Sequence, residues 1–276
     1  MQTSLEINDL TVLVDGAGPT LVFVHGWPDG PALWEPAVTA LKARYRCVRV
    51  TLPGFDLKKP PRPVSVDAMC GLLAEVVDEV SPTEPVTLVL HDWGCFFGYE
   101  FAARHRKRVE AVVGVDIGDT NSGAYLSQLT LKEKLLIAGY QLWLAVAWKL
   151  GPLWPGMASR MTRYMARAIG CRTPSETIAW QMNYPYAMQW FGSLGGLRGV
   201  ARVGKFLGDE VPTLFIYGQR KPFMFHSRQW VLNLAKKPGC AAHGLETGHW
   251  VMRQQPEAFN TLLLNWLERR RADSGV

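Results

Sequence analysis

The stretch Val89-Leu90-His91-Asp92-Trp93-Gly94 decides the fold of this chain of 276 residues. It completes the apolar run Val86–Leu90, which predicts a buried strand, and it leads into Phe96–Arg104, which has helical spacing. A strand that turns sharply into a helix is the setting of a nucleophile elbow, which normally reads G-x-S-x-G. In this sequence Asp92 takes the position of the nucleophilic serine.

Two roles are open to Asp92 at such a turn. Its carboxylate would lie at the carboxyl end of the strand, beside a helix N-terminus whose dipole favours a negative charge. A carboxylate in this position can attack a saturated carbon and form an alkyl ester. The alternative is that Asp92 caps the helix, which is a common role of aspartate at a helix start.

Short apolar runs along the chain predict buried strands, because they lack the alternation of polar and apolar residues found in a half-exposed sheet. Helical segments separate these runs, so we expect a parallel sheet covered by helices on both faces. The predicted strands are Thr20–His25, Cys47–Leu52, Val86–Leu90, Val109–Val115 and Pro212–Tyr217, and the clearest helices are Val64–Val80, with Ser65 as its cap, and Leu262–Arg270.

The segment 121–203 interrupts this order, because it contains many aromatic residues and no convincing strand. We expect it to form an all-helical cap domain, inserted into a core made of residues 1–120 and 204–276. Such a cap would cover the carboxyl edge of the sheet, where open α/β sheets bind ligands. Its most apolar stretch, Leu135–Trp148, has fourteen residues, which is too short to span a bilayer and predicts a buried or pocket-lining helix.

Two further motifs could complete a site around Asp92. In Val24–Asp29 (VHGWPD) the end of a strand leads into a turn that can aim the amide of Trp27 at the elbow. With the amide of Trp93 it would form an oxyanion hole, although a plain strand-to-loop turn is the alternative. His249 precedes the final helix, where a catalytic base that follows the nucleophile in chain order belongs.

In this order and spacing, the three motifs resemble those of the α/β-hydrolase fold, and most closely its epoxide hydrolase and haloalkane dehalogenase branch. In that branch the elbow carries Asp, commonly within G-H-D-W-G, and the oxyanion turn of epoxide hydrolases reads H-G-x-P. The corresponding stretches here are Leu90–Gly94 and His25–Pro28, and the resemblance covers essentially the whole chain. Leu90 and Cys95 stand where the family frequently has glycine. We interpret Cys95 as a packing residue, since Asp92 disfavours its thiolate.

The resemblance also implies an acid that orients His249 and stabilises its imidazolium. Many relatives place this acid after the strand expected here at Pro212–Tyr217, but the stretch that follows it, Gly218–Pro222, contains no acid. One group of haloalkane dehalogenases places the acid after the strand that follows the elbow helix instead. By that match Asp116 is the expected acid, and Asp119 is the second choice, with capping of the lid as its alternative role.

Epoxide hydrolases further use lid tyrosines, usually two, to protonate the oxygen of the opened ring. A phenol suits this role because it is a neutral hydrogen-bond donor at pH 7. The later tyrosine would be Tyr186 or Tyr184, of which we favour Tyr186, and Tyr140 and Tyr125 are candidates for the earlier one. Packing of the lid is the alternative for each tyrosine. We expect further substrate contacts from His25, Pro28, Trp93, Trp143, Trp190 and Trp250.

The resemblance therefore implies a hydrolase that opens an apolar epoxide to a vicinal diol, through an ester on Asp92 that His249-activated water releases.

A haloalkane dehalogenase would use the same two residues, but it needs N–H donors for a halide, and Trp27 replaces the asparagine that often supplies one. Fluoroacetate-type dehalogenases resemble H-D-R-G-x-R at the nucleophile, which this chain lacks. A ligand-binding protein without catalysis is the remaining alternative, because Leu90 replaces glycine and no acid follows Tyr217.

Composition narrows the partners that we expect. The chain has 30 Lys and Arg against 24 Asp and Glu, and the net charge of +6 is spread along it, so we expect no nucleic-acid partner. It contains no phosphate-binding glycine loop and no metal-ligand spacing, so we expect neither a cofactor nor a metal. Five cysteines without a CxxC pair, and an N-terminus unlike a signal peptide, predict a cytoplasmic protein. We expect a monomer or homodimer without stable membrane insertion.

Overall fold

The computed structural model describes residues 2–191 and 211–274. Its centre is an eight-stranded sheet with the order β1-β2-β4-β3-β5-β6-β7-β8. Strands β3 to β8 run parallel to one another, whereas β2 is antiparallel to β4 and β1 is antiparallel to β2. The strands are β1 (Thr3–Ile7), β2 (Leu10–Asp15), β3 (Thr20–Val24), β4 (Arg46–Val50), β5 (Val86–His91), β6 (Val109–Val115), β7 (Thr213–Gly218) and β8 (Ala241–Leu245).

The five predicted strands correspond to β3 to β7, but the prediction missed the edge strands β1 and β8 and also β2, which lies between β1 and β4. β1 and β8 are partly exposed and lack the continuous apolar runs that mark the buried strands, and β2 alternates between buried and half-buried positions along most of its length. β1 and β2 form a hairpin in which Ile7 pairs with Leu10 across a two-residue turn. Both turn residues, Asn8 and Asp9, have positive φ angles, of 46° and 61°, which these two residue types tolerate in tight hairpin turns.

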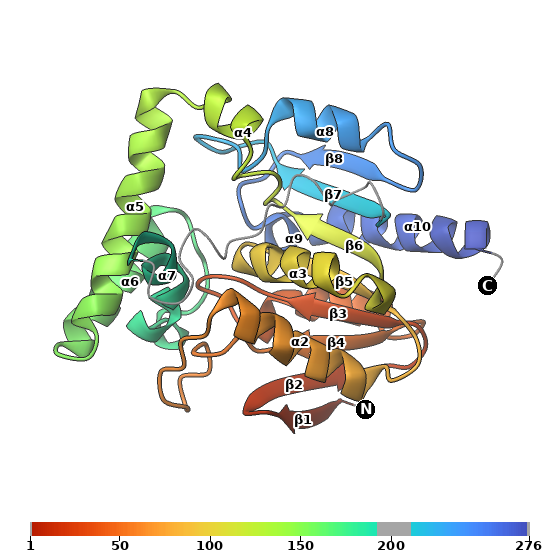
Figure 1. The fold of residues 1–276 in the computed structure, drawn as a ribbon, viewed down its shortest axis with the longest axis horizontal. Coiled ribbons are helices and arrows are strands. Elements are labelled where there is room, and N and C mark those ends of the chain that lie inside the picture. The colour runs from red at the N-terminus through yellow and green to blue at the C-terminus, as the bar shows by residue number, and fades with distance from the viewer. Residues whose placement is uncertain (1, 192–210, 275–276) are drawn as a thin grey trace.

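Helices cover both faces of the sheet (Figure 1). α2 and α3 pack together on one face, and α1 and α10 pack together on the other. Ser65 caps α2 as predicted, because its hydroxyl accepts a hydrogen bond from the Ala68 amide at 3.1 Å. The bounds of these helices are α1 (Glu35–Leu41), α2 (Val66–Val80), α3 (Trp93–Arg104) and α10 (Pro256–Ser274).

A group of helices between β6 and β7 extends beyond the carboxyl ends of the strands (Figure 1). These helices are α4 (Gly123–Gln128), α5 (Leu131–Leu150), α6 (Pro155–Ala168) and α7 (Tyr184–Phe191). We refer to residues 121–191, which carry these helices, as the cap; residues 192–203 of the segment predicted to form a cap domain lie outside the described ranges. The expectation of a buried or pocket-lining helix holds for one side of α5 only, because Leu142 and Val146 are exposed. Within the parts that the structure describes, no helix is both long and apolar enough to cross a membrane.

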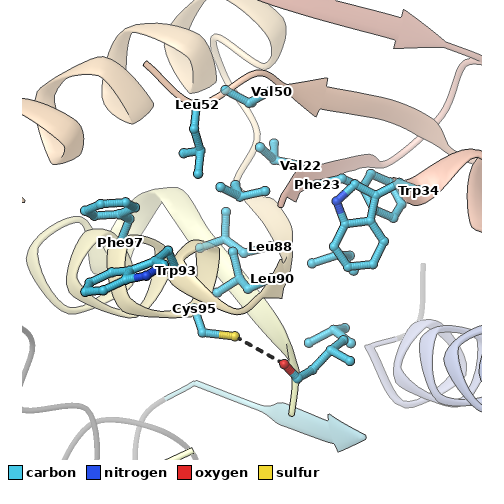
Figure 2. Packing of buried hydrophobic residues seen from close by; sticks show 14 of the residues in the cluster. Val22, Phe23, Trp34, Val50, Leu52, Leu88, Leu90, Trp93, Cys95 and Phe97 are labelled. Atoms are coloured by element: carbon cyan, nitrogen blue, oxygen red, sulfur yellow. Dashed lines mark hydrogen bonds between the residues drawn. The ribbon is translucent and has the colours of Figure 1, made fainter. Parts of the chain in front are cut away.

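The core beneath the elbow is packed from both faces of the sheet, as Figure 2 shows. Leu88 and Leu90 of β5 lie beside Trp93 and Phe97 of α3, while Phe23 packs against the ring of Trp34 on the other face. Full burial of an aliphatic side chain such as that of Leu90 contributes roughly 1.5–3 kcal/mol to stability. This packing holds the end of β5 and the start of α3 in one rigid unit, and Asp92 lies between them.

Candidate active site

Asp92 occupies the turn between β5 and α3 with a φ of 52° and a ψ of −124°, a conformation that few non-glycine residues adopt. Its side chain forms no capping hydrogen bond with α3, so the interpretation of Asp92 as a helix cap is wrong. The carboxylate instead faces Gly26 of the turn after β3, where a Cβ atom would overlap it. Glycine at position 26 therefore allows this turn to approach Asp92 closely.

Backbone amides converge on the Asp92 carboxylate. The amide of Trp27 donates a hydrogen bond to Asp92 Oδ1 at 2.6 Å, and the neighbouring amide of Trp93 helps to lower the pKa of this carboxyl. The turn that carries Trp27 contains a cis peptide bond between Trp27 and Pro28. Two amides that point at one carboxylate can stabilise negative charge that develops there.

The cap holds the Trp27 side chain in place. The indole Nε1 of Trp27 donates to Asn183 Oδ1 at 2.8 Å, and Asn183 Nδ2 donates to Thr162 Oγ1 at 2.8 Å. Both Asn183 and Thr162 are fully buried, and they come from the short helix Trp180–Asn183 and from α6. Sequence analysis did not find Asn183, because its partner Trp27 lies 156 positions away along the chain.

His249 lies between two carboxylates. Its Nδ1 is 2.6 Å from Asp116 Oδ2, and its Nε2 is 3.5 Å from Asp92 Oδ2. Burial alone would lower the pKa of His249, but the hydrogen bonds and negative charges of the two carboxylates outweigh burial and raise the pKa to about 9. Burial would likewise raise the pKa of Asp92, yet its interactions with His249 hold that pKa below its usual value.

Asp116 follows β6 with a φ of 68° and is fully buried. While Oδ2 contacts His249, Oδ1 accepts hydrogen bonds from the Gly218 amide, at 3.0 Å, and from Lys221 Nζ. Burial opposes ionisation of Asp116, but the Lys221 charge and the bond with His249 prevail and hold its pKa far below the usual range.

Asp119, the second choice for the acid, lies elsewhere. Its carboxylate accepts hydrogen bonds from the Ser227 amide at 2.6 Å and from the hydroxyls of Ser227 and Ser122 at 2.7 and 2.6 Å. Ser122 caps α4. Asp119 therefore ties the first helix of the cap to the core, and the structure brings Asp116 rather than Asp119 to His249.

His91 supports the backbone of His249 from behind. Its Nε2 lies 3.2 Å from the carbonyl oxygen of His249, and the two rings are 4.4 Å apart. Burial, together with the neighbouring His249 charge, lowers the pKa of His91 to about 3, so the ring is neutral at pH 7 and donates its Nε2 hydrogen to that carbonyl.

Two cavities, of about 970 and 840 Å³, meet at Asp92. Tyr140 and Tyr186 line both of them, and burial raises the pKa of each phenol above its usual value, so both remain protonated at neutral pH. The rings of Trp93 and Tyr186 pack edge to face, with their centres 5.3 Å apart. The remaining lining is mostly apolar, with Phe96, Ile117, Tyr125, Leu129 and Trp190 in the larger cavity and Met165, Ile169, Phe223, Phe225 and Trp250 in the smaller.

Comparison with known proteins identifies the family of this chain. The model of the "Alpha/beta hydrolase family" matches residues 21–262 of this chain. The chain belongs to this family. The protein named "Probable oxidoreductase EphD" in Mycobacterium tuberculosis is 39% identical to this family member over 90 residues, which make up 32% of this chain and 15% of EphD. Epoxide hydrolase 1 of Caenorhabditis elegans is 23% identical, and the match covers 91% of this chain and 65% of the relative. The chain thus spans less than two thirds of the length of either relative.

A solved structure shares the fold of this α/β-hydrolase family member. It is a mutant form of an epoxide hydrolase from Bacillus megaterium, in complex with its diol product. The TM-score is 0.73 at 19% identity, and the match covers 96% of this chain and all of the other (100%). At this identity the likeness establishes the fold, and the chemistry has to be argued from the side chains of this chain.

Four residues expected at the site of this hydrolase-family chain are not brought to it. His25 is fully buried, and its Nε2 accepts from the Leu52 amide at 3.1 Å, so it fixes the turn after β3 rather than a ligand. Pro28 is buried and lines neither cavity. Tyr184 packs against Phe55 and Trp148, away from Asp92. Trp143 donates its indole hydrogen to the Met161 carbonyl on the outside of the cap, at 3.0 Å.

Packing explains how the chain accommodates Leu90 and Cys95, which stand where the family frequently has glycine. Leu90 is fully buried against α3, and Cys95 places its sulfur 3.6 Å from the Val115 carbonyl (Figure 2). Burial raises the pKa of the Cys95 thiol to about 12, and the charge of Asp92 adds a smaller contribution, so the thiol is inert. In residues 2–191 and 211–274, no group of three or more His, Cys, Asp or Glu side chains is arranged to hold a metal ion.

Proposed function

We propose that this chain hydrolyses apolar epoxides to vicinal diols through an ester on Asp92. The observation that carries the proposal is the position of Asp92, with His249 on one side and the phenols of Tyr186 and Tyr140 lining the same mostly apolar cavities. A neutral phenol can protonate the oxygen of an opened ring, and an apolar lining selects an uncharged substrate.

Ring opening uses the free oxygen of the nucleophile. Because Oδ1 accepts the Trp27 amide, Oδ2 is the oxygen that attacks a ring carbon as the bond between that carbon and the ring oxygen breaks. The electron pair of this bond passes to the ring oxygen, which takes a proton from Tyr186 or Tyr140. The product of this step is an alkyl ester of Asp92 that still carries the new hydroxyl group.

Release of the diol requires neutral His249. Esterification favours this form, because it removes the negative charge of Asp92 that helps to raise the pKa of His249, and the imidazolium can then lose its proton to solvent. The imidazole takes a proton from water as the water oxygen attacks Cγ of Asp92, and the charge that develops on Oδ1 meets the amides of Trp27 and Trp93. The bond between Cγ and Oδ2 then breaks, the imidazolium protonates the departing diol, and the second proton of the water restores the phenol. Asp116 stabilises the imidazolium during this step.

The indole groups near the cavities give a haloalkane dehalogenase less support than the site gives an epoxide hydrolase. A leaving halide needs N–H donors that are not already used, yet the indole of Trp27 is bonded to Asn183 and that of Trp190 to Gln141 Oε1 at 3.2 Å. The Trp93 ring lies edge-on against the Tyr186 ring, with the ring centres 5.3 Å apart. A halide held by the indole of Trp27 or Trp190 would therefore break a hydrogen bond that the structure already contains.

Trapping the ester tests the proposal. In H249Q the first step remains possible and the second lacks its base, so incubation with a panel of apolar epoxides and haloalkanes should stall the chain as an ester. Intact-mass spectrometry should then show an added mass equal to a whole epoxide, located on Asp92 and absent from the double variant H249Q/D92N.

Other outcomes of this experiment contradict the proposal in distinct ways. An added alkyl mass without the halogen would make the chain a dehalogenase. If no panel member forms an adduct, Asp92 is not the nucleophile for these electrophiles, and a ligand-binding function without catalysis gains support.

A further inference from the structure

Lys221 is a buried cation that sequence analysis did not identify. It lies in the loop after β7, its side chain is only 5% exposed, and its ammonium contacts Asp116 Oδ1. The ammonium also lies 5.2 Å from the centre of the Phe225 ring, which in turn packs against the ring of His249. A buried ammonium is costly unless it is paired, so its pairing with the carboxylate that serves His249 calls for an explanation.

The two carboxylate oxygens of Asp116 have different partners. Oδ2 contacts the imidazole, at 2.6 Å, while Oδ1 is held by Lys221 and by the Gly218 amide. The plane of the carboxylate is thereby fixed, and with it the direction in which His249 Nε2 points. Lys221 borders the smaller cavity, but within the described residues no hydrogen bond or ion pair joins it to Asp92. Its effect on the reaction therefore passes through Asp116.

The charges around His249 balance only when Lys221 is counted. Asp92 and Asp116 each carry one negative charge and Lys221 carries one positive charge, while His91 and His226 are neutral at pH 7. Burial and the Lys221 charge lower the pKa of His226 to about 4. Formation of the ester removes the charge of Asp92, and Asp116 with Lys221 then sum to zero beside a neutral imidazole. Without Lys221, the uncompensated Asp116 would hold a proton on His249.

We propose that Lys221 is a positioning residue for Asp116 and His249, whose ammonium fixes the Asp116 carboxylate and balances its charge so that His249 is neutral beside the ester. This role rests on the ester mechanism proposed above. The loop after β7 contains no acid, so it does not orient His249 directly. Through Lys221 it instead determines whether His249 is neutral or charged.

The test uses a charge mimic of the ester, so that it does not depend on turnover. D92N replaces the carboxylate by a neutral amide, as esterification does, and NMR of isotope-labelled histidine then gives the pKa of His249, identified by its loss in H249Q. In D92N/K221M the pKa of His249 should be higher than in D92N by about one to two pH units, because one charge close to the imidazole has been removed.

Two controls separate this effect from a general structural one. D92N/K221R keeps the charge and should retain the pKa of His249 in D92N. D92N/R220M removes a neighbouring cation whose guanidinium is exposed and pairs with Glu246 at 2.8 Å, so it should also leave that pKa unchanged. If K221M does not fold, K221Q removes the charge while keeping a donor for Asp116.

An equal pKa of His249 in D92N and in the folded, uncharged Lys221 variant would overturn the inference. Failure of the ester mechanism has a different signature, namely the absence of an adduct in H249Q, and would leave the NMR result unaffected. In the otherwise unmodified chain with styrene oxide as probe, K221M should slow ester breakdown at pH 7 at least tenfold and shift its pH profile upward, while ester formation changes less than threefold.

Discussion

Leu90 fills the space that the missing side chain of Gly98 leaves on α3, and a Cβ atom at Gly98 would overlap the leucine. The pair explains how this chain carries leucine in a motif position where its family usually has glycine. Gly98, six residues after Asp92, makes room for the larger side chain at position 90, so the backbone at Asp92 keeps its sharp turn.

G98A should therefore destabilise the chain by about 1–3 kcal/mol, because the added methyl group forces the Leu90 side chain out of its position. The free energy of unfolding in urea measures this effect. The double variant L90A/G98A should lose less stability than the two single losses added together, since the alanine at 90 leaves room for the new methyl group. Strict additivity would show that the two positions do not share this space.

Asn183 of the cap accepts a hydrogen bond from the Trp27 indole. We therefore expect the cap to help hold the turn whose Trp27 amide donates to Asp92. N183L removes the acceptor of a buried indole hydrogen and should lower the free energy of unfolding by about 1–3 kcal/mol. If the turn loosens as well, the amide of Trp27 is misplaced, and the breakdown of an ester on Asp92 slows more than its formation. Rapid-quench mass spectrometry separates the two rates, and equal slowing of both would contradict this role of the cap.

Tyr186 and Tyr184 form a matched pair for testing the proposed acid. Y186F should slow ester formation with an epoxide about 100-fold, because a positioned proton donor contributes at that order. Y184F should leave this rate unchanged and should not reduce stability, since the buried Tyr184 hydroxyl has no hydrogen-bond partner in the described structure. Single-turnover kinetics and urea unfolding check both variants. A loss of rate in Y184F, or none in Y186F, would contradict the role of Tyr186 as the acid, and the second result would favour Tyr140.

The raised pKa of His249 predicts how stability depends on pH. The pKa rises from an ordinary value of 6.5 to about 9 in the folded chain, so between these values the folded state holds a proton that the unfolded state has released. The stabilisation from this proton is complete below pH 6.5 and is lost as the pH rises through 9, and it amounts to a few kcal/mol.

Urea unfolding at about pH 6.5 and about pH 9 measures this loss, and H249Q serves as the control. In H249Q the fall in stability over this interval should shrink, because the group that binds the extra proton is absent. An identical fall in both proteins would assign the pH dependence to other groups.

The sequence alone predicted the parts of this molecule that depend on local pattern. Continuous apolar runs marked the central strands, because strands buried on both faces need apolar residues at every position. Resemblance of short motifs pointed to Asp92, Trp27, His249 and Asp116, which the structure brings together. The edge strands were missed because their exposed side chains remove the same pattern.

Only the tertiary structure decided contacts between distant segments and the rotation of helices. Lys221 is 105 positions from Asp116, and no local period records such a pairing. Tyr184 and Tyr186 are two positions apart on α7, so they point in widely different directions, and packing of α7 against α5 sets which phenol faces Asp92. Sequence periodicity shows that a helix has an apolar side, but the phase of that helix relative to a distant carboxylate is fixed only when the whole chain packs.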